Sequence, residues 1–429
     1  MTAYIRSDCN TGWMHGDIKG AFLSDTDTTN ITGSELVTNG TFASNNVTGW
    51  TERESGGSFT ASGGQATLAY SSGVTSWRQD ITIVSGETYT LSFDIVSTTT
   101  SSIQFYYNHG SGDLGVSLSG SAGKFSVTFV AASNSVRIFP RIFNSGNMVL
   151  DNISLRIAEE DRSVNDNGLQ VFGTITKSAV ATGAELVSYG SFSTLNRLRQ
   201  PYNSDLTFGT NDFSIMFWVK HDGTDAHQSI VGRDDREFAI FILNNTSYNR
   251  RIRIYSHNSS DSVQTFDSTD DPFSMNVWNH VCVNYTGGNT CTIYINGVFD
   301  NTGTLNYDIN DTTHQLFVGV RNDSTNANES FPAANCKLAL LRISKSVPSE
   351  EQVKKIYDDE KCLYHENAKC TLHGTSDAVT GLAFDDTNDI LHVGTSSGRS
   401  EFQGLNRINN TTTAVTTAIS ASNGLVAEQ

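Results

Sequence analysis

Residues 213–219, Phe-Ser-Ile-Met-Phe-Trp-Val, restrict the possible folds of this chain more than any other segment. Its apolar side chains alternate between the two sides of an extended strand: Phe213, Ile215, Phe217 and Val219 on one, Met216 and Trp218 on the other. A strand that is apolar on both sides has to be covered on both sides. The segment therefore predicts a central strand in a sheet that lies inside a layered structure.

The same two-residue period recurs in other parts of the chain. Residues 77–84 and 88–95 both alternate, and the turn residues Ser-Gly-Glu at 85–87 separate them, which predicts a hairpin with one apolar face. Further alternating segments continue to residue 155, so a second sheet is needed to cover this face. A jelly-roll sandwich meets that requirement.

A helical period occurs convincingly in one place, residues 349–360. Ser349 can cap its N-terminus and Gln352 completes a capping box, so we expect a short helix that packs outside the second sandwich or bridges to the tail. Elsewhere the chain is rich in Asn, Ser, Thr and Gly, and only 17% of its residues are charged. Short strands joined by many turns are typical of such a composition, and the predicted fold class is all-β.

The charge of the chain excludes some classes of partner. A formal net charge of −17 repels a phosphate backbone, so nucleic acid is not expected as a partner. No apolar run approaches the ~20 residues that span a bilayer, and the first residues lack the apolar region of a secretory signal. The six cysteines are too sparse for a disulfide framework and predict unpaired, mostly buried thiols.

Residues 34–157 resemble the carbohydrate-binding jelly rolls related to families 4 and 9. The resemblance is carried by three segments: Leu-Val-Thr-Asn-Gly-Thr-Phe at 36–42 followed by Gly49-Trp50, Gly-Glu-Thr-Tyr-Thr-Leu-Ser-Phe at 86–93, and Asp-Asn-Ile-Ser-Leu at 151–155. It implies a jelly roll with Trp50 in the core and with a possible role in glycan binding.

The resemblance and the aromatic residues together suggest two sites. In these families an acid after the Phe and the Asp near the last strand help to bind a structural calcium; this chain keeps Asp151 but has Ala43 at the first position. Trp77, Tyr106 and Tyr107 are candidates for a platform on which a pyranose ring stacks. The alternative is that these strand aromatics belong to the core.

The following region, to about residue 346, resembles laminin-G and concanavalin A-like sandwiches. The segment 213–219 is joined in this resemblance by Trp-Asn-His-Val at 278–281, Tyr-Ile-Asn-Gly at 294–297 and Leu-Ala-Leu-Leu-Arg-Ile-Ser at 338–344. Residues 277–297 predict a hairpin that ends in a tight turn at Asn296-Gly297.

Some enzymes with this fold are laminarinase-type glycosidases, which carry Glu-x-Asp-x-x-Glu on one strand to position two catalytic carboxylates. No such run occurs in residues 162–346. The acidic stretches at 234–237 and 267–271 lie beside turn residues and are interpreted as solvated loops or a calcium-binding rim, and His280 is interpreted as structural. We therefore predict no catalytic residues.

The two ends of the chain share a different pattern. Residues 379–398 predict two strands around an Asp/Asn turn and resemble a fragment of a β-propeller blade, and residues 13–23 have a similar character. Because single blade fragments leave apolar faces and edges exposed, we predict that these ends pair with each other or with a neighbouring chain.

In its succession of modules the chain resembles the C-terminal part of marine bacteriophage, cyanophage-like virion proteins of the tail-fibre or appendage type. The resemblance implies a virion-surface protein, made in the bacterial cytoplasm, that contacts host-surface polysaccharide and other virion proteins and forms an oligomer. Two alternatives stay open: a polysaccharide-degrading enzyme or its accessory subunit, and a purely structural virion component without glycan affinity.

The expected organisation has five parts. These are a blade-like strand segment (1–33), the jelly roll (34–160), the laminin-G/concanavalin A-like sandwich (161–347), the helix (348–364) and a blade-like tail (365–429). The junction at 161–168 is polar and rich in turn residues.

Overall fold

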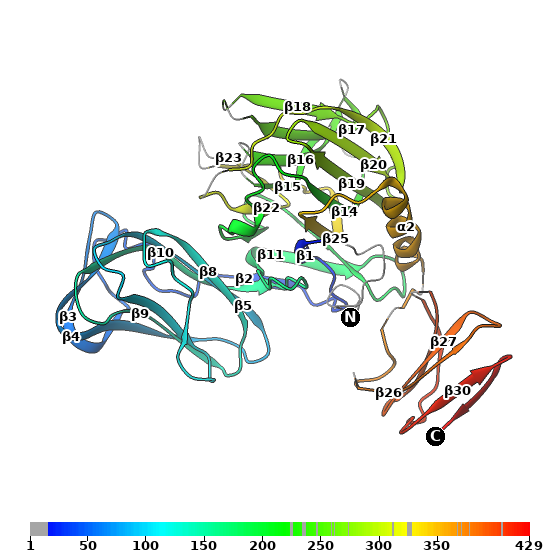
Figure 1. Ribbon diagram of the computed structural model, residues 1–429, viewed down its shortest axis with the longest axis horizontal. Helices are drawn as coiled ribbons and strands as arrows, with labels where there is room; N and C mark the ends of the chain where they lie inside the picture. The colour runs from blue at the N-terminus through cyan, green and yellow to red at the C-terminus, as the bar shows by residue number, and fades with distance from the viewer. Residues whose placement is uncertain are drawn as a thin grey trace.

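The computed structural model describes residues 16–429 apart from residues 224–225, 234–236, 246–247, 259, 261, 273, 311–312, 324–327, 367, 370, 377 and 405. The described chain is all-β with one short α-helix, as predicted. Figure 1 shows a jelly roll, a larger sandwich that carries the helix α2, and a smaller tail of β-strands. Within the described part, no helix is long and apolar enough to cross a membrane.

The jelly roll has its own core between two antiparallel layers. One layer runs β6–β9–β4–β3 and the other β8–β5–β10–β4, because the long strand β4 pairs with β9 through its second half and with β10 through its first half. Trp50 is buried between the layers beside Phe42 and Phe59, as predicted. The strands are β3 (Thr51–Ser62), β4 (Gln65–Thr82), β5 (Thr88–Thr98), β6 (Ile103–Asn108), β7 (Leu114–Gly115), β8 (Gly123–Val130), β9 (Ser135–Ile142) and β10 (Asn147–Glu159).

The predicted hairpin between residues 77–84 and 88–95 is wrong. These residues belong to β4 and β5, which pair with β9 and β10 respectively rather than with each other, so the turn at 85–87 crosses from one layer to the other. When the two strands lie in opposite layers, their apolar faces pack against each other and are buried. If the two strands were paired in one sheet, the apolar face of that sheet would still have to be covered by another layer.

The larger sandwich encloses the second core. Its strands are β1 (Ile18–Phe22), β2 (Ile31–Gly33), β11 (Leu169–Ala179), β12 (Val187–Gly190), β13 (Arg197–Gln200), β14 (Phe213–His221), β15 (Ala226–Arg233), β16 (Phe238–Asn245), β17 (Tyr248–His257), β18 (Val263–Asp267), β19 (Asn279–Thr286), β20 (Thr290–Ile295), β21 (Val298–Thr304), β22 (Leu316–Val318), β23 (Arg321–Asp323), β24 (Asn328–Ser330) and β25 (Cys336–Ser344). A short 3₁₀ turn, η1 (Ser204–Leu206), follows β13.

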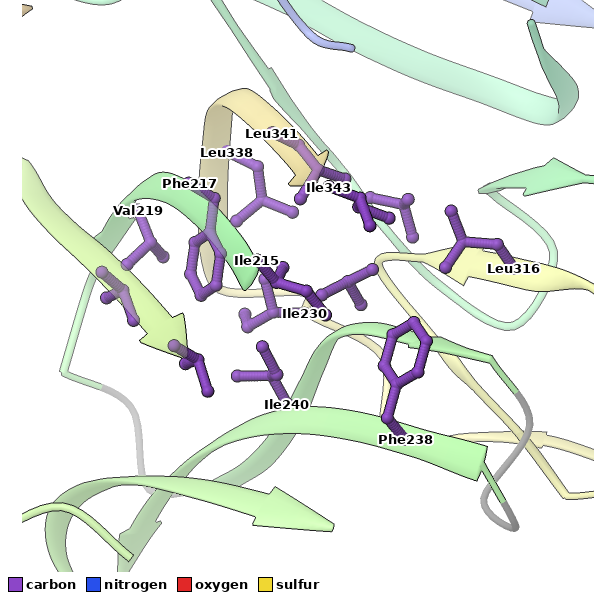
Figure 2. Packing of buried hydrophobic residues seen from close by; sticks show 14 of the residues in the cluster. Ile215, Phe217, Val219, Ile230, Phe238, Ile240, Leu316, Leu338, Leu341 and Ile343 are labelled. Carbon is purple, nitrogen blue, oxygen red and sulfur yellow. The ribbon is translucent and has the colours of Figure 1, made fainter. Parts of the chain in front are cut away.

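One layer of this sandwich runs β1–β25–β14–β19–β20–β21 and the other β11–β13–β22–β15–β16–β17–β18. The strand predicted to be central, β14, lies between β19 and β25. Figure 2 shows Ile215 and Phe217 of β14 facing Ile240 and Phe238 of the opposite layer.

The predicted hairpin and helix are confirmed. β19 pairs with β20, and β20 with β21 across a turn in which Asn296 and Gly297 both have positive φ, +51° and +75°. These values are those of a two-residue type I′ turn. Helix α2 (Glu350–Glu360) has the full capping box of Ser349 and Gln352, and its Val353 and Ile356 pack on the outer side of the β14 layer.

The two ends do not pair with each other as predicted. β1 pairs with β25, from Ile18 opposite Ser344 to Phe22 opposite Leu341, and so belongs to the larger sandwich; residues 13–15 lie outside the described residues. Phe22 is buried in the core of that sandwich, so the apolar face of β1 is covered and its edge is paired without the C-terminal tail.

The tail begins after the 3₁₀ turn η2 (Lys361–Tyr364) and forms separate sheets. β26 (Val379–Asp385), β27 (Ile390–Thr395), β28 (Gly398–Gln403) and β29 (Asn406–Asn410) make an antiparallel meander, and β30 (Ile419–Ser422) with β31 (Leu425–Glu428) makes a hairpin beside it. The predicted strands around an Asp/Asn turn are β26 and β27.

The junction between the two sandwiches is a bonded corner. β10 continues through it and pairs at its end with β11, Ala158 opposite Gln170. Asp161 is fully buried there and accepts hydrogen bonds from the backbone N–H groups of Ala21, Ser163 and Asn167. We therefore expect limited proteolysis to spare residues 161–168 in the folded chain, which a digestion followed by mass spectrometry would check.

The four cysteines that the structure describes are unpaired and mostly buried, as predicted. Cys282, Cys291 and Cys336 are buried and free, and Cys362 is partly buried and free. Burial raises the pKa of the Cys282 thiol to about 12. Cys9 and Cys370 lie outside the described residues.

Candidate functional site

The three aromatic residues proposed as a stacking platform do not share one surface. Tyr106 and Tyr107 are neighbours on β6 and therefore point to opposite sides of the layer. Tyr107 is 8% exposed and stacks in the core on Phe129 at 5.0 Å. Trp77 is partly buried against the same core, 5.8 Å from Phe59. The prediction of one platform is wrong because strand alternation turns Tyr106 away from Tyr107, and the rings of Trp77 and Tyr107 pack against the core.

Tyr106 lies on the outer jelly-roll face, the surface formed by Arg53, Glu54, Tyr106, Phe139 and Arg141. Its ring stacks on Phe139 at 5.0 Å, and the Arg53 guanidinium lies 3.8 Å from the centre of the Phe139 ring. Arg141 donates to Glu54 at 2.5 Å. Arg53 in turn pairs with Asp113 at 2.8 Å, so the charged groups of this face have partners within the protein.

Asp151, the candidate calcium ligand, lies at an irregular part of β10 opposite Asp94 of β5. Its Oδ1 accepts the backbone N–H of Asn152 at 2.7 Å, and burial raises the pKa of the carboxyl group. Among the described residues, no group of three or more His, Cys, Asp or Glu side chains is arranged to hold a metal ion. Calcium at Asp151 stays a prediction.

The acidic stretch at 267–271 has a structural explanation. Asp267 accepts two hydrogen bonds from Arg253, both 2.7 Å, and Asp270 and Asp271 pair with Arg251 and Arg250. In the other stretch, Glu237 is buried beside Arg233 at 3.5 Å, while residues 234–236 lie outside the described residues.

His280 is also structural, as the sequence indicated. It is fully buried against Trp218, 5.3 Å between ring centres, and burial lowers its pKa to about 3. A histidine that stays neutral and out of contact with solvent has no route to a substrate. His280 and the arginine-paired acids of residues 267–271 therefore do not provide the two exposed carboxyl groups that a glycosidase needs.

A hollow of about 460 Å³ lies where the two sandwiches meet. We call it the inter-sandwich cleft. The jelly roll contributes segment 35–41, β5, β8 and β10, and the larger sandwich contributes β11, β13 and the residues just after β13. Its volume falls within the range of ~300–1,000 Å³ that is usual for ligand sites, and junctions between domains are preferred positions for them.

The walls of the cleft combine charged, amide and aromatic side chains. These include Glu35, Asn39, Asp94, Lys124, Phe125, Asn152, Arg156, Phe172, Arg199, Tyr202 and Gln315. The sequence analysis missed this site because its lining comes from segments as far apart as residues 35 and 315. One local signal is the segment Arg-Leu-Arg-Gln-Pro-Tyr at 197–202. Its two arginines lie on the same side of a strand and are followed by a tyrosine, which is unusual in so acidic a chain.

The two carboxylates of the cleft hold its walls in place. Glu35 accepts hydrogen bonds from the backbone N–H groups of Val37 and Leu155 and from the Ser154 hydroxyl, and lies 3.3 Å from Arg156. Asp94 accepts from Lys124 Nζ and Asn152 Nδ2, both at 2.9 Å. These hydrogen bonds fix the orientation of both carboxylates and of the groups that donate to them.

The two sandwiches are connected beside the cleft by Gln170, which is fully buried and contacts the lining residue Arg199. Its amide nitrogen donates to the Thr90 carbonyl oxygen at 3.2 Å in the jelly roll, and its Oε1 accepts from Arg199 Nη2 at 2.6 Å in the larger sandwich. A buried amide bonded on both sides rigidifies its surroundings. The cleft is therefore preformed, with rigid walls that suit binding of a polar ligand.

Comparison with known proteins identifies the fold of the larger sandwich. Residues 199–354, a little over a third of the chain, match the family model of the concanavalin A-like lectin/glucanases superfamily. A search of curated proteins finds no match.

Similar solved structures include toxin binding domains. The binding domain of Paraclostridial Mosquitocidal Protein 1 is 14% identical with a TM-score of 0.40, and covers 56% of this chain and 62% of its own. The receptor-binding domain of the botulinum neurotoxin C/D mosaic serotype is 12% identical with a TM-score of 0.38, and covers 57% and 59%. The chain thus spans about three fifths of the length of these neighbours. From the family match, residues 199–354 have the concanavalin A-like sandwich fold that the resemblance of their motifs implied.

Proposed function

We propose that the chain is a non-enzymatic adhesion or decoration protein of a bacteriophage virion, and that its inter-sandwich cleft binds a glycan of the host surface. The observation that carries the glycan part is the cleft itself. Saccharides present hydroxyl groups and apolar ring faces, and the cleft offers amides, charged groups and the rings of Phe125, Phe172 and Tyr202 within one preformed hollow.

Binding is favoured over hydrolysis by the state of the carboxylates. Glu35 and Asp94 each hold neighbouring groups through several hydrogen bonds, whereas a glycosidase needs two carboxyl groups that face the scissile bond. The virion part of the proposal rests on the resemblance of the successive modules, including the blade-like tail. Other virion proteins and further copies of the chain are its proposed partners at the virion surface.

A glycan array on the full chain tests the binding and its place. Tyr202→Ala removes a ring from the cleft, and we expect it to weaken the strongest signals at least tenfold, about 1.4 kcal/mol. Tyr106→Ala is the matched control, because it removes a tyrosine from the outer jelly-roll face, and should leave the signals unchanged. The opposite ranking would place the site on that outer face.

Three further experiments test the remaining parts of the proposal. Repeating the array with EDTA tests the proposed calcium at Asp151, since loss of a structural ion should lower binding or thermal stability. Release of reducing ends from the bound polysaccharide would contradict the non-enzymatic reading. Mass spectrometry of purified virions that failed to find the chain would contradict its proposed location.

A further inference from the structure

A lysine and an aspartate are in contact where the segment between β1 and β2 lies beside β11. Lys177 Nζ is 2.7 Å from Asp25 Oδ2, and the lysine side chain is only 6% exposed. Because a carboxyl C–O bond is about 1.2 Å long, the carboxyl carbon of Asp25 is at most about 4 Å from this nitrogen. The two residues are 152 positions apart in the sequence, so the fold alone brings them together.

Hydrogen bonds of the backbone hold the aspartate in place. The carbonyl oxygen of Asp25 accepts the N–H of Val187 on β12. Its Oδ1 accepts the backbone N–H groups of Thr26 and Asp27, at 2.6 and 3.1 Å, and Oδ2 is the oxygen that contacts Lys177. Groups that are held in contact in this way react far faster than the same groups free in solution.

A third ionisable group, Glu159, lies beside this pair. It is buried at the end of β10 and accepts the hydroxyl of Tyr189, which lies opposite Lys177 in the pairing of β11 with β12. Burial raises the pKa of Glu159 to about 7, and the charges of Asp25 and Lys177 act on it in opposite directions. A carboxyl group that keeps its proton near neutral pH can pass protons between an amine and a carboxylate beside it.

From this geometry we propose that Lys177 and Asp25 form an intramolecular isopeptide bond, with Glu159 as the proton relay. The lysine nitrogen bonds to the carboxyl carbon of Asp25, the bond from this carbon to Oδ2 breaks, and Oδ2 leaves as water. Both protons of the water come from the ammonium group. One ammonium and one carboxylate thus become one amide and one water molecule, without an oxidant or a reductant. The bond does not depend on glycan binding.

The surroundings assist each step of this condensation. A proton moves from Lys177 to Oδ2 along their hydrogen bond, which leaves a nucleophilic amine. During its attack negative charge develops on Oδ1, to which Thr26 and Asp27 already donate their N–H groups. Glu159 gives its proton to the departing oxygen and takes one from the nitrogen, so it returns to its original state. Burial of the lysine weakens the solvation of the ion pair and favours the neutral amide.

The position of the bond gives it a mechanical consequence. β2 and β11, which pair with each other, belong to the larger sandwich, and the jelly roll is inserted between them in the chain. A bond from Asp25 to Lys177 therefore closes a covalent loop around the whole jelly roll. Closing a loop lowers the conformational entropy of the unfolded chain, so the linked protein resists unfolding more than the unlinked one.

Mass spectrometry of the intact chain tests the bond. We expect a mass lower by one water molecule than the mass calculated from the sequence, and a branched peptide in a digest that joins Lys177 to Asp25. Lys354 and Asp358 are an internal control, because they are 2.6 Å apart but the lysine is 61% exposed, and they should stay unlinked. A native chain that keeps its full calculated mass after prolonged incubation contains an ion pair only and overturns the proposal.

Variants assign the roles of the residues. Lys177→Arg keeps the positive charge, but its guanidinium is always protonated and is not a nucleophile, so the branched peptide and the mass deficit should disappear. Lys354→Arg is the control and should keep both. Glu159→Gln still accepts the Tyr189 hydroxyl but cannot relay protons, and we expect linking at least about tenfold slower in a time course of cell-free synthesis.

The remaining outcomes are distinguishable. A mass deficit that survives Lys177→Arg shows that water is lost elsewhere in the chain and overturns the bond. Linking at the native rate in Glu159→Gln overturns the proton relay. Unfolding curves show whether each variant is folded, and the branched peptide of the native chain decides the proposal independently of every variant.

Discussion

Glu360→Ala is expected to destabilise the concanavalin A-like sandwich by about 3–5 kcal/mol, because it removes one partner of a buried ion pair. Glu360 and Arg342 are 1% and 3% exposed, and their side chains are joined by two contacts of 2.7 and 2.8 Å. Glu360 also accepts the indole N–H of Trp218 at 2.8 Å. The variant leaves the arginine charge in the core without this carboxylate and deprives the indole of its acceptor.

Hydrogen exchange followed by mass spectrometry on peptides from β14 and β25 would measure the loss locally. Lys354→Ala is the matched control, because Lys354 pairs with Asp358 on the exposed side of the same helix and such pairs contribute only a few tenths of a kcal/mol. Replacing both buried partners, Glu360→Leu with Arg342→Met, should cost less than Glu360→Ala alone. Equal protection in Glu360→Ala and the native chain would contradict the role of this pair.

Glu159 is expected to make the stability of the chain depend on pH between about 4.5 and 7. Burial raises the pKa of its carboxyl group from 4.5 to about 7, although the Tyr189 hydroxyl, which donates to it at 2.6 Å, acts in the opposite direction. Because the folded state holds this proton more tightly than the unfolded state, its contribution is complete below about pH 4.5 and is lost as the pH rises through about 7.

The expected size of this contribution is about 3 kcal/mol, since each pKa unit corresponds to about 1.4 kcal/mol. Glu159→Gln removes the titration and can still accept the Tyr189 hydroxyl. The stability of the variant relative to the native chain should therefore rise by about that amount between pH 4 and pH 8, as measured by urea unfolding. Glu160→Gln, at the partly exposed next position, is the control. Parallel pH curves for the native chain and Glu159→Gln would contradict the prediction.

The sequence was sufficient for features that depend on near neighbours. The alternation in residues 213–219 predicted a central covered strand, and β14 is one. Ser349 and Gln352 predicted a capped helix, and Asn296-Gly297 a tight turn; both are present. In each case the signal and the structure lie within a few residues of each other, so local stereochemistry determines the result.

Which strands are neighbours was decided by the tertiary structure. Alternation tells which residues share a face but not which strand lies beside them. Residues 77–84 and 88–95 were therefore assigned to one hairpin, although the second half of β4 pairs with β9 in one layer and β5 pairs with β10 in the other. In β25, a bulge at Leu340, where φ is +51°, turns both Leu338 and Leu341 into the core. A simple two-residue period would place these leucines on opposite sides.

The same distinction applies to the candidate site. Trp77, Tyr106 and Tyr107 could be recognised as aromatic residues on strands, but the packing of Trp77 and Tyr107 against the jelly-roll core is a property of the folded sheets. The inter-sandwich cleft lies between segments that are distant in the sequence, beside the place where β10 pairs with β11 and Gln170 bonds to both sandwiches. The sequence alone thus determined strands, turns, the helix and the fold class, which are set by short-range pattern. The neighbours of each strand and the cleft depended on burial between distant segments, which no local pattern contains.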